Sequence, residues 1–526
     1  MKHLATIALL LTLPLLARAA TYDVLIRHGL VVDGTGNPGF HADVAVQGGR
    51  IAAIGKITGT ARKEIEAAGL VVAPGFIDVH THADDVAEFP AAENFLRMGV
   101  TTLVVGNCGG SALDVKQLFR GIEKQKVSVN VATLVGHNTV RERAMGGVFD
   151  RQPTPAELEE MKALVRQAMQ DGAVGLSTGL IYRPGTFSDT DEVVELAKVI
   201  APFDGIYTSH MRHEDWRIDS ALDEVFQVAR VAGVRAEVSH IKLTGEKSWG
   251  QAARILGRLE AARAEGLDIT QDEYAYTASS TLLAQLIPDY AFDGGWKKFQ
   301  TLCADPPEKA KLAADIKQRL RNRGGTNFAY AVIAHYAHDP SLDGLNIVEA
   351  ARKLHQADTL EAQVETILEI EQHGGGTGVF HGMNEDDMQQ FMRHPNTMFA
   401  SDSGSREFGK AMPHPRGYGN NARILGHYVR ELKVLRLEDA IRKMTSLPAE
   451  TFHLANRGQL QAGRAADITI FNPATVQSSS TYSDPHHYAE GIPFVLVNGV
   501  SVIQDSQHTG ARPGQALRRT MLNNAP

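Results

Sequence analysis

The spacing of apolar positions divides the chain into two strand-rich ends and a long middle. Near both ends, short apolar runs alternate with turns, and Gly34, Gly36, Gly48 and Gly49 mark the first of these turns. Apolar runs bounded by glycines are typical of β-strands. The expected strands cover residues 22–26, 30–33, 42–47, 50–54 and 70–72, and later 467–471, 493–497 and 499–503.

In the middle of the chain, apolar strands alternate with amphipathic helices. Helical periodicity is clear at residues 155–170, 190–201, 220–232 and 249–266. The expected strands between the helices cover residues 75–80, 101–106, 127–135, 173–177, 205–210, 235–240, 267–274 and 397–402. Eight such units favour a closed (β/α)8 barrel over an open sheet. Residues 279–376 interrupt the alternation between the seventh and eighth strands, which predicts a mostly helical insertion over the barrel mouth.

The first residues have the layout of a secretory signal peptide. A short basic start, Met1 to His3, precedes an apolar run at residues 4–16 and the small-residue pattern Ala17-Arg18-Ala19. We expect cleavage after Ala19 and an exported protein, periplasmic or secreted. The alternative is a buried N-terminal helix. No other apolar stretch is long enough to span a bilayer, so no membrane insertion is expected of the mature protein.

Composition and charge exclude several kinds of partner. Hydrophobic residues make up 43% and charged residues 22% of the chain, which is the composition of an ordinary globular protein. The net charge is -8, and no run of lysine or arginine suggests a nucleic-acid partner. A small-molecule substrate is expected instead.

The two cysteines have different surroundings in the sequence. Cys108 follows an apolar strand inside the turn Gly-Asn-Cys-Gly, whereas Cys303 lies in what looks like an ordinary helix. A disulfide between them would join positions far apart in unlike contexts. We therefore expect Cys108 to have a chemical role and Cys303 a structural one.

Candidate metal ligands follow the expected barrel strands. In a barrel of this kind, active groups lie at the carboxyl ends of the strands. Those ends carry His80, His82, Cys108, His210, His240 and Asp402. Alternate strand residues point the same way, so His80 and His82 would face one site. A single His-x-His motif occurs often by chance, and His210 and His240 could be core histidines. The prediction of a metal site depends on all six falling at strand ends.

Cys108 and Asp402 suit different tasks at such a site. A cysteine beside a metal loses its proton and becomes a soft ligand. Asp402 could bind metal and also accept a proton from water, which makes it the candidate catalytic base. The alternative for Asp402 is a turn or helix-capping residue before Ser403 and Gly404.

Several segments together resemble the N-acyl-D-amino-acid deacylase (D-aminoacylase) branch of the amidohydrolase superfamily. The resemblance covers almost the whole mature chain. Gly-Asn-Cys-Gly at 106–109 and Ser-Thr-Gly-Leu at 177–180 are the more discriminating motifs. Further motifs lie at residues 73–82, 209–212, 239–242, 401–402 and 413–416. The resemblance implies a barrel at residues 74–455 and a small β-sandwich built from residues 20–73 and 456–526.

The resemblance also implies roles for individual residues. His80, His82 and Asp402 would form one zinc site, and Cys108, His210 and His240 the other, with Cys108 as the bridge. One zinc would bind tightly. The resemblance does not decide whether a second zinc also binds, at a weaker or bridged site. Lys242, Arg416 and either Tyr274 or Tyr276 would bind the free carboxylate of the substrate. Alternation along a strand places both tyrosines on one face, so the sequence does not decide between them. A surface salt bridge is the alternative for either cation.

The implied function is zinc-dependent cleavage of N-acyl-D-amino acids to a carboxylate and a free D-amino acid. Metal-activated water would attack the amide, with Asp402 as general base and then acid. The runner-up is a periplasmic dipeptidase or broader amidase with the same metal chemistry. A non-catalytic binding protein of the cell envelope is the alternative from another class. The sequence leaves the preferred side chain, the acyl group, the strictness for the D-isomer and the oligomeric state open.

Overall fold

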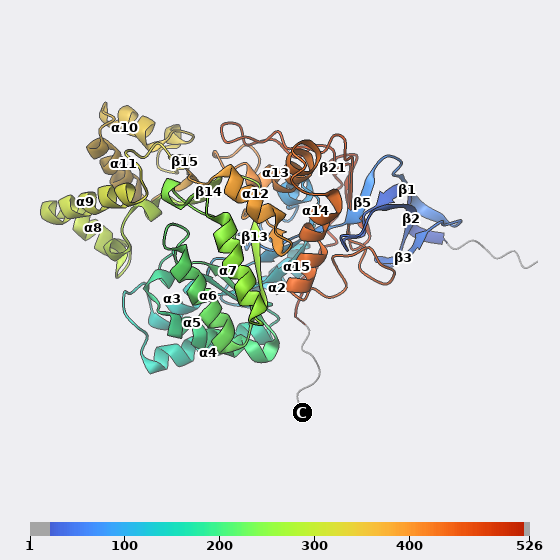
Figure 1. The fold of residues 1–526 in the computed structure, drawn as a ribbon, viewed down its shortest axis with the longest axis horizontal. Helices are drawn as coiled ribbons and strands as arrows, with labels where there is room; N and C mark the ends of the chain where they lie inside the picture. Colours follow the sequence, from blue (N-terminus) through green and yellow to red (C-terminus); the bar gives the residue numbers. More distant parts are fainter. Residues whose placement is uncertain (1–20, 520–526) are drawn as a thin grey trace, which may run out of the picture.

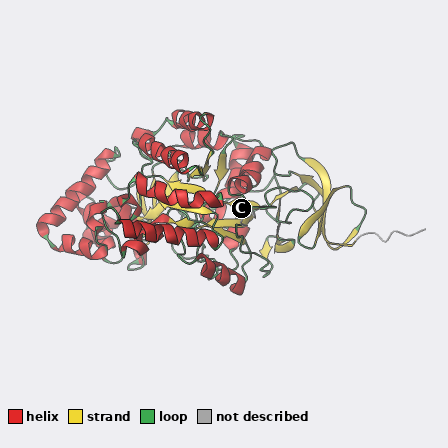
Figure 2. Cartoon of the chain, turned by 90° about the horizontal axis from the view of Figure 1, so that it is seen from below, coloured by secondary structure: helices red, strands yellow, loops and turns green. Residues whose placement is uncertain are grey.

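A computed structural model describes residues 21–519 and shows an elongated molecule with three parts (Figure 1). A barrel occupies the centre, a helix-rich insertion lies at one end of the long axis, and a β-sheet built from both chain ends lies at the other. Figure 2 shows the same division, with the helices of the insertion and the strands of the terminal sheet at opposite ends. The expected signal peptide lies outside the described residues. Within them, no helix is long and apolar enough to cross a membrane.

The centre of the molecule is a closed barrel of parallel strands. The strands in order are β6 (Phe76–Asp78), β7 (Val100–Val105), β8 (Asn130–Thr133) continued by β9 (Val135–Gly136), β10 (Gly175–Gly179), β11 (Ile206–His210), β12 (Arg235–Val238), β13 (Ile269–Glu273) and β17 (Thr397–Phe399). A parallel bridge between Thr81 and Ser403 joins the last strand to the first, and the Asp402 amide donates to the His80 carbonyl at 2.9 Å. Each of the eight expected strands is present within a few residues of its predicted place.

Helices cover the outside of the barrel. They are α1 (Glu93–Leu96), α2 (Val115–Gln125), α3 (His137–Met145), α4 (Pro155–Gln170), α5 (Thr190–Ile200), α6 (Ile218–Ala232), α7 (Ala252–Ala264), α12 (Glu385–Arg393), α13 (Arg416–Arg423) with a π-helical extension at Ile424–Glu431, α14 (Leu437–Met444) and α15 (Ser446–Thr451). Short 3-10 helices lie in the connections at Gly185–Phe187, Ala201–Phe203 and Glu246–Ser248.

Helix α4 shows how local sequence determines these boundaries. Thr154 and Glu157 form a reciprocal capping box, and Pro155 occupies the first helical turn, where its missing N–H costs nothing. Met161, Val165 and Met169 recur every four residues and are buried against the barrel. The helix therefore starts and packs where the sequence predicts.

The insertion contains a small sheet that the sequence analysis did not predict. Its helices are α8 (Trp296–Ala304), α9 (Pro306–Asn322), α10 (Ile347–His355) and α11 (Leu360–Gln372), with 3-10 helices at Leu283–Leu286, Asp289–Phe292 and Pro340–Leu342. Strands β14 (Ala278–Leu282), β16 (Thr377–His381) and β15 (Ala331–His335) pair antiparallel. The insertion therefore extends from β14 to β16 and is mixed α and β. It has a hydrophobic core of its own, which includes Phe299 and Leu312.

The chain ends share one nine-stranded mixed sheet rather than two separate sheets. The strands are β1 (Thr21–Val31), β2 (Phe40–Gln47), β3 (Arg50–Gly55), β4 (Thr60–Glu66), β5 (Val71–Pro74), β18 (Ile468–Phe471), β19 (Phe494–Val497), β20 (Val500–Gln504) and β21 (Gln507–His508). β5 pairs with β18, so the two ends of the chain meet there. Alternate residues such as Val24, Ile26, Ile468 and Ile470 share one hydrophobic core.

The joint between this sheet and the barrel is a buried polar network around Asp467. Its carboxylate pairs with Arg457, accepts from Asn130 of β8 at 3.2 Å and accepts from the Asn498 amide at 2.7 Å. Asp467 and Arg457 are both buried. The Asp467 carboxylate thus connects β8 of the barrel with the start of β18 and the end of β19 in the terminal sheet.

Candidate metal centre

The carboxyl ends of the barrel strands bring the six candidate ligands together. His80 and His82 follow β6, Cys108 follows β7, His210 ends β11, His240 follows β12 and Asp402 follows β17. Their donor atoms form overlapping groups in which all atoms lie within 4.8 Å of one another. These groups are His80, His82 and Cys108, then Cys108, His210 and His240, then His80, His240 and Asp402.

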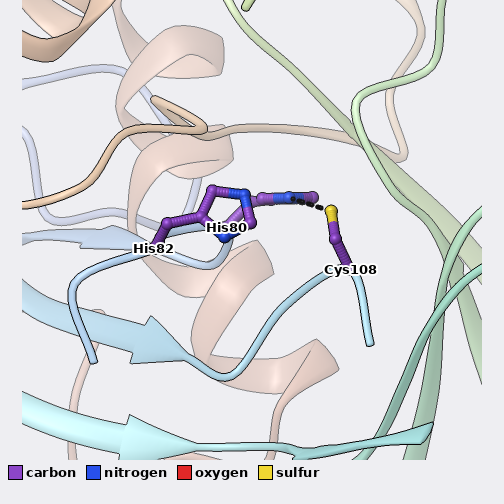
Figure 3. Close-up of side chains that lie close together, drawn as sticks. All are labelled: His80, His82 and Cys108. Carbon is purple, nitrogen blue, oxygen red and sulfur yellow. Dashed lines mark hydrogen bonds between the residues drawn. The ribbon is translucent and has the colours of Figure 1, made fainter. Parts of the chain in front are cut away.

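The Cys108 thiol lies at the middle of the cluster. Its Sγ is 3.2 Å from His80 Nε2, 3.5 Å from His210 Nδ1 and 3.7 Å from His240 Nε2. Figure 3 shows the His80 and His82 rings beside this sulfur. Cys108 and Cys303 are both free, so neither is committed to a disulfide.

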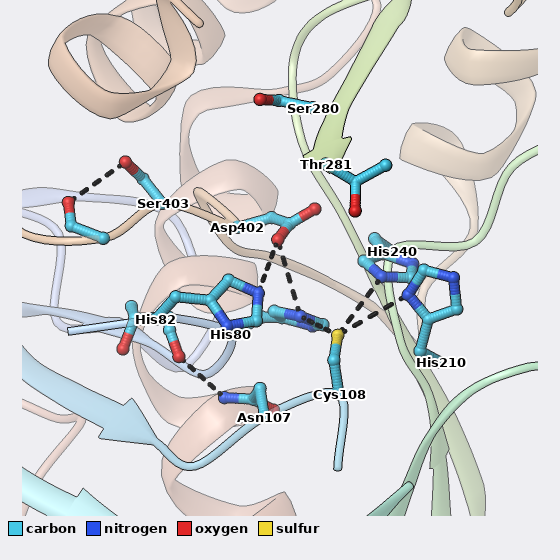
Figure 4. Close-up of polar contacts among 12 residues, drawn as sticks. His80, His82, Asn107, Cys108, His210, His240, Ser280, Thr281, Asp402 and Ser403 are labelled. Atoms are coloured by element: carbon cyan, nitrogen blue, oxygen red, sulfur yellow. Dashed lines mark hydrogen bonds and ion pairs between the residues drawn. The ribbon is translucent and has the colours of Figure 1, made fainter. Parts of the chain in front are cut away.

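Asp402 closes the other side of the cluster. Its Oδ1 lies 3.1 Å from His82 Nε2 and 3.6 Å from His80 Nε2 (Figure 4). Its Oδ2 lies 2.8 Å from Arg416 Nη1. One oxygen therefore faces the histidines while the other is held by a buried guanidinium.

The spacing of these atoms fits a zinc site. Tetrahedral zinc binds nitrogen and sulfur at about 2.0–2.3 Å, which separates its ligands by about 3.5 Å. The distances from Cys108 to the three histidines bracket that value. His210 directs Nδ1 at the Cys108 sulfur, while its Nε2 lies 3.7 Å from Glu214 Oε1. The donor set of imidazoles, a thiol and a carboxylate suits zinc.

The backbone is strained at three of these positions. Cys108, His240 and Asp402 have φ values of 53°, 34° and 50°. Residues other than glycine rarely adopt this left-handed region, and such strain concentrates at functional sites. Close contacts hold the Cys108 turn in place: a Cβ added at Gly179 would lie 2.1 Å from the Cys108 carbonyl oxygen. Glycines at the strand ends therefore permit the tight turn that carries the thiol.

Two buried carboxylates support the cluster, and the sequence analysis missed both. Asp272 on β13 lies with Oδ2 3.2 Å from His80 Nδ1, so it orients that ring. Glu214 Oε1 lies 3.2 Å from His240 Nδ1 and 2.6 Å from Lys242 Nζ. The sequence positions of both carboxylates could have indicated this role. Asp272 lies near the end of an expected barrel strand, and Glu214 comes four residues after the candidate ligand His210.

Electrostatics favour the ionised forms of Cys108 and Asp402. Burial raises the pKa of the Cys108 thiol, but His80 and His210 outweigh it and hold that pKa well below its usual range. Burial also raises the pKa of Asp402, and Arg416, His80 and His82 reverse the shift, so that this pKa lies well below its usual range. A thiolate and a carboxylate at the centre are the states that a cation needs.

A cavity of about 410 Å³ opens onto the cluster. Barrel residues His210, His240, Lys242 and Asp402 line its floor. The insertion supplies the opposite wall, which includes Phe328, Tyr330 and Phe380. Tyr182 of the loop after β10 also lines the cavity, with its ring centroid 4.6 Å from that of His210, and sequence analysis did not single it out.

The four residues expected to bind a carboxylate lie in different places. Lys242 lines the cavity, with Nζ bonded to Glu214. Arg416 lies behind Asp402, and its guanidinium is 4.6 Å from the Tyr274 ring centroid. Lys242 Nζ lies 5.8 Å from the same centroid, so the two cations flank Tyr274.

Tyr276 points away from the cluster, contrary to the expectation that it shares a face with Tyr274. Its hydroxyl lies 3.5 Å from Ser478 Oγ, and Arg423 lies 5.1 Å from its ring centroid. The expectation assumed that the strand continues through both tyrosines. Strand β13 ends at Glu273, so the alternation of side chains stops before Tyr274.

A closed parallel barrel with a buried cluster of imidazole, thiol and carboxylate groups at the strand ends is the architecture of a metal-dependent barrel hydrolase. A model of the amidohydrolase family matches residues 63–503. The D-aminoacylase of Alcaligenes xylosoxydans xylosoxydans is 34% identical over 95% of this chain and 98% of its own length. The N-acyl-D-glutamate deacylase of the same organism is 35% identical over 94% of this chain and 96% of its own.

A solved structure of N-acyl-D-glutamate deacylase from Bordetella bronchiseptica, with zinc and a phosphonate inhibitor, has a TM-score of 0.81 to this chain. It is 34% identical and covers 95% of this chain and all of that one. The chain therefore belongs to the amidohydrolase family, in the branch that contains D-aminoacylase and N-acyl-D-glutamate deacylase.

Proposed function

We propose that this protein is a zinc-dependent deacylase that hydrolyses N-acyl-D-amino acids to a carboxylate and a free D-amino acid. The observation that carries the proposal is the clustering of His80, His82, Cys108, His210, His240 and Asp402, of which His210, His240 and Asp402 line one cavity. Relatives of almost equal length hydrolyse substrates of this class, as their names state.

Two overlapping ligand sets are proposed for zinc. Cys108, His210 and His240 would hold the tighter ion, since a buried thiolate and two imidazoles match its preference. His80, His82 and Asp402 would hold a weaker one, with Cys108 between the sets. When bound, zinc would polarise the amide carbonyl and make water a stronger nucleophile.

Asp402 would move the protons of the reaction. Hydrolysis adds water across the C–N bond, so a proton leaves the attacking water and another must reach the departing nitrogen. The Oδ1 atom of Asp402 faces the histidines, while the contact with Arg416 fixes the carboxylate and keeps it ionised. Asp402 can therefore accept the first proton and deliver it to the amine.

Lys242 and Arg416 would attract the free carboxylate of the substrate. Lys242 lies on the cavity wall, and Arg416 adds a second buried positive charge behind Asp402. Charge-assisted contacts of this kind fix orientation as well as affinity. We also propose that the protein is exported, with the signal peptide at residues 1–19, on the sequence pattern alone.

Hydrolysis of N-acetyl-D-methionine and its L-isomer tests the proposed activity. Enzyme loaded with zinc should hydrolyse the D-isomer at least about tenfold faster, which corresponds to about 1.4 kcal/mol between the two transition states. A chelator should abolish the activity, and added zinc should restore it in proportion to the metal content measured on the same sample.

The same assay distinguishes the competing functions. Preferential hydrolysis of dipeptides would contradict the deacylase proposal in favour of a dipeptidase. Tight zinc binding without hydrolysis of any N-acyl amino acid or dipeptide would mean that the site binds metal but is not catalytic.

A further inference from the structure

A second carboxyl group lies beside Asp272 in the barrel interior. Glu237 is on β12 and Asp272 is on β13, and the two strands pair in parallel. In the register of this pair Glu237 lies opposite Thr270, and Asp272 comes two residues later on the same face of its strand. Both carboxyl groups are buried. Because Asp272 points at His80 inside the barrel, Glu237 points into the interior as well.

One oxygen of each carboxyl group has no donor. Among the described residues, neither Glu237 Oε1 nor Asp272 Oδ1 receives a hydrogen bond. The second oxygen of Glu237, Oε2, accepts from the Ser239 hydroxyl at 3.0 Å. The second oxygen of Asp272, Oδ2, lies 3.2 Å from His80 Nδ1. The two carboxyl groups lie within hydrogen-bonding reach of each other, and two ionised carboxylates can only accept, so this contact requires a proton.

The residues that flank Glu237 in the sheet are neutral. Thr208 of β11 and Thr270 of β13 are its register partners on either side. Both threonines are buried. His80 can carry a positive charge, but it already pairs with Asp272. The surroundings therefore balance one negative charge at the two carboxyl groups and leave a second one without a partner.

The proton belongs to Glu237 rather than to Asp272. His80 offers Nε2 to the cluster, so its Nδ1 carries the hydrogen that Asp272 accepts, which favours an ionised Asp272. Burial raises the pKa of Glu237 well above its usual range, and the charge of Asp272 raises it further. A neutral Glu237 can donate its O–H to Asp272 and still accept from Ser239.

A hydrogen bond from Glu237 would fix the direction of Asp272. With a donor at each oxygen, the carboxylate keeps Oδ2 aimed at His80 Nδ1. The imidazole then stays in one tautomer, with Nε2 directed at the cluster, where it lies 3.2 Å from Cys108 Sγ. Without that donor, Asp272 would have a buried oxygen that is unsatisfied and free to turn.

We propose that Glu237 is a positioning residue, a neutral acid that donates a hydrogen bond to Asp272 and thereby fixes the His80 imidazole for zinc. The inference rests on the proposed function, in which His80 holds zinc. Glu237 acts only through Asp272, so its loss should change metal affinity more than it changes the fold.

Infrared difference spectroscopy of the metal-free protein tests the protonation of Glu237 without any enzyme activity. The spectrum of the wild type minus that of Glu237→Gln, taken at about pH 8, should contain the carbonyl band of a protonated carboxyl group. A difference spectrum with carboxylate bands alone would mean that Glu237 is ionised and would overturn the inference. Glutamine keeps the shape of the side chain, so this comparison decides even if larger changes at Glu237 prevent folding.

Glu237→Met tests the positioning role, because it keeps the length of the side chain and removes the donor. Zinc affinity, measured by competition with a chelator, should fall by at least about tenfold for the more weakly bound ion, as is usual when a residue behind a metal ligand is lost. Glu237→Gln should stay within about threefold of the wild type, because its amide can donate the same hydrogen bond.

Glu273→Met is the matched control on the same strand. Glu273 follows Asp272, is equally buried, and has no hydrogen-bond partner for either oxygen within residues 21–519. Side chains alternate along a strand, so Glu273 points away from His80. Its zinc affinities should equal those of the wild type. Equal losses in Glu237→Met and Glu273→Met would mean a general disturbance of the core and would overturn the inference.

Failure of the inference can be told apart from failure of the proposed function. If the wild type binds zinc and hydrolyses N-acyl-D-amino acids, but Glu237→Met leaves every zinc affinity unchanged, the inference is wrong and the deacylase proposal stands. Equal losses in Glu237→Gln and Glu237→Met also overturn it. If glutamine preserves zinc affinity, methionine lowers it and the wild type hydrolyses none of these substrates, the positioning role stands and the deacylase proposal is wrong. A wild type that binds no zinc contradicts both.

Discussion

At the scale of single residues, the site depends on side chains whose two ends have different partners. His80 offers Nε2 to the cluster while Nδ1 meets Asp272, and Asp402 offers Oδ1 while Oδ2 meets Arg416. A second partner fixes the tautomer of the imidazole and the orientation of the carboxylate before any substrate enters. The protein thus supplies a site that needs little rearrangement.

Replacing Asp402 with asparagine tests its proposed role as proton carrier. Asp402→Asn keeps the shape of the side chain and removes the group that would accept and return the proton. Turnover should fall by about 10²–10⁴-fold, the usual contribution of general acid–base catalysis. Steady-state kinetics measure this, together with zinc content, which should remain in the set of Cys108, His210 and His240. Near-normal turnover with zinc retained would contradict the role.

At the scale of elements, glycines at strand ends determine how close neighbouring turns can approach. Gly179 ends β10 directly beside the turn that carries Cys108. Gly257, by contrast, lies in the exposed part of helix α7 and has nothing within 4 Å of an added Cβ. The two positions therefore form a matched pair for the same substitution.

Gly179→Ala should displace the Cys108 turn and lower the zinc content of the purified protein. The added methyl would lie 2.1 Å from a backbone oxygen, which cannot move without the turn. We expect a loss of stability of about 1–3 kcal/mol, as for overpacking in a core. Gly257→Ala should instead be neutral or stabilise the protein by up to about 1 kcal/mol. Denaturant unfolding and metal analysis measure both, and full zinc occupancy in Gly179→Ala would refute the argument.

The elements that sequence predicted well are those with a strong apolar pattern. The barrel strands are buried on both faces, so their apolar runs are continuous and easy to recognise. Strand β4 was missed because its sequence, Thr-Ala-Arg-Lys-Glu-Ile-Glu, is polar and lies at the sheet surface, where only Ile65 is buried. In the sheet of the insertion, β14 has the same weak pattern, whereas β15 and β16 are apolar but only five residues long and lie among helices.

The residues of the candidate site likewise fall into those that the sequence located and those that it missed. Strand ends could be located from sequence, and six side chains at those ends lie in one cluster. Glu214 and Tyr182 lie in loops, where no periodicity indicates the direction of a side chain. Their proximity to the cavity depends on tertiary packing, which a single sequence does not encode in any local pattern.

At the scale of the whole molecule, buried polar contacts join the barrel to the terminal sheet, and the Asp467 network is the one among them that contains a buried ion pair with Arg457. Asp467→Asn would leave the buried Arg457 without a charged partner. Breaking such a pair costs about 3–5 kcal/mol. Thermal unfolding should therefore start at a clearly lower temperature.

The control for Asp467→Asn is Asp439→Asn, which breaks an exposed pair with Arg436. Exposed pairs contribute about 0–1 kcal/mol, so its melting temperature should barely change. Calorimetry of the two variants measures the difference. Equal melting temperatures would mean that Asp467 does not hold the two parts together.

The pairing of β5 with β18 also has a consequence for the order of folding. Strands β1 to β5 are made first, yet the free edge of β5 gains its partner only when residues from 468 onward have left the ribosome. Until then, an early strand presents unpaired backbone groups to solvent, a state prone to mispairing with other chains. Closing so long a loop is slow, and it couples β5 to a strand that is synthesised much later. The terminal sheet is therefore completed only once β18 has been synthesised, and a chain truncated before β18 is expected to aggregate rather than accumulate as a folded barrel.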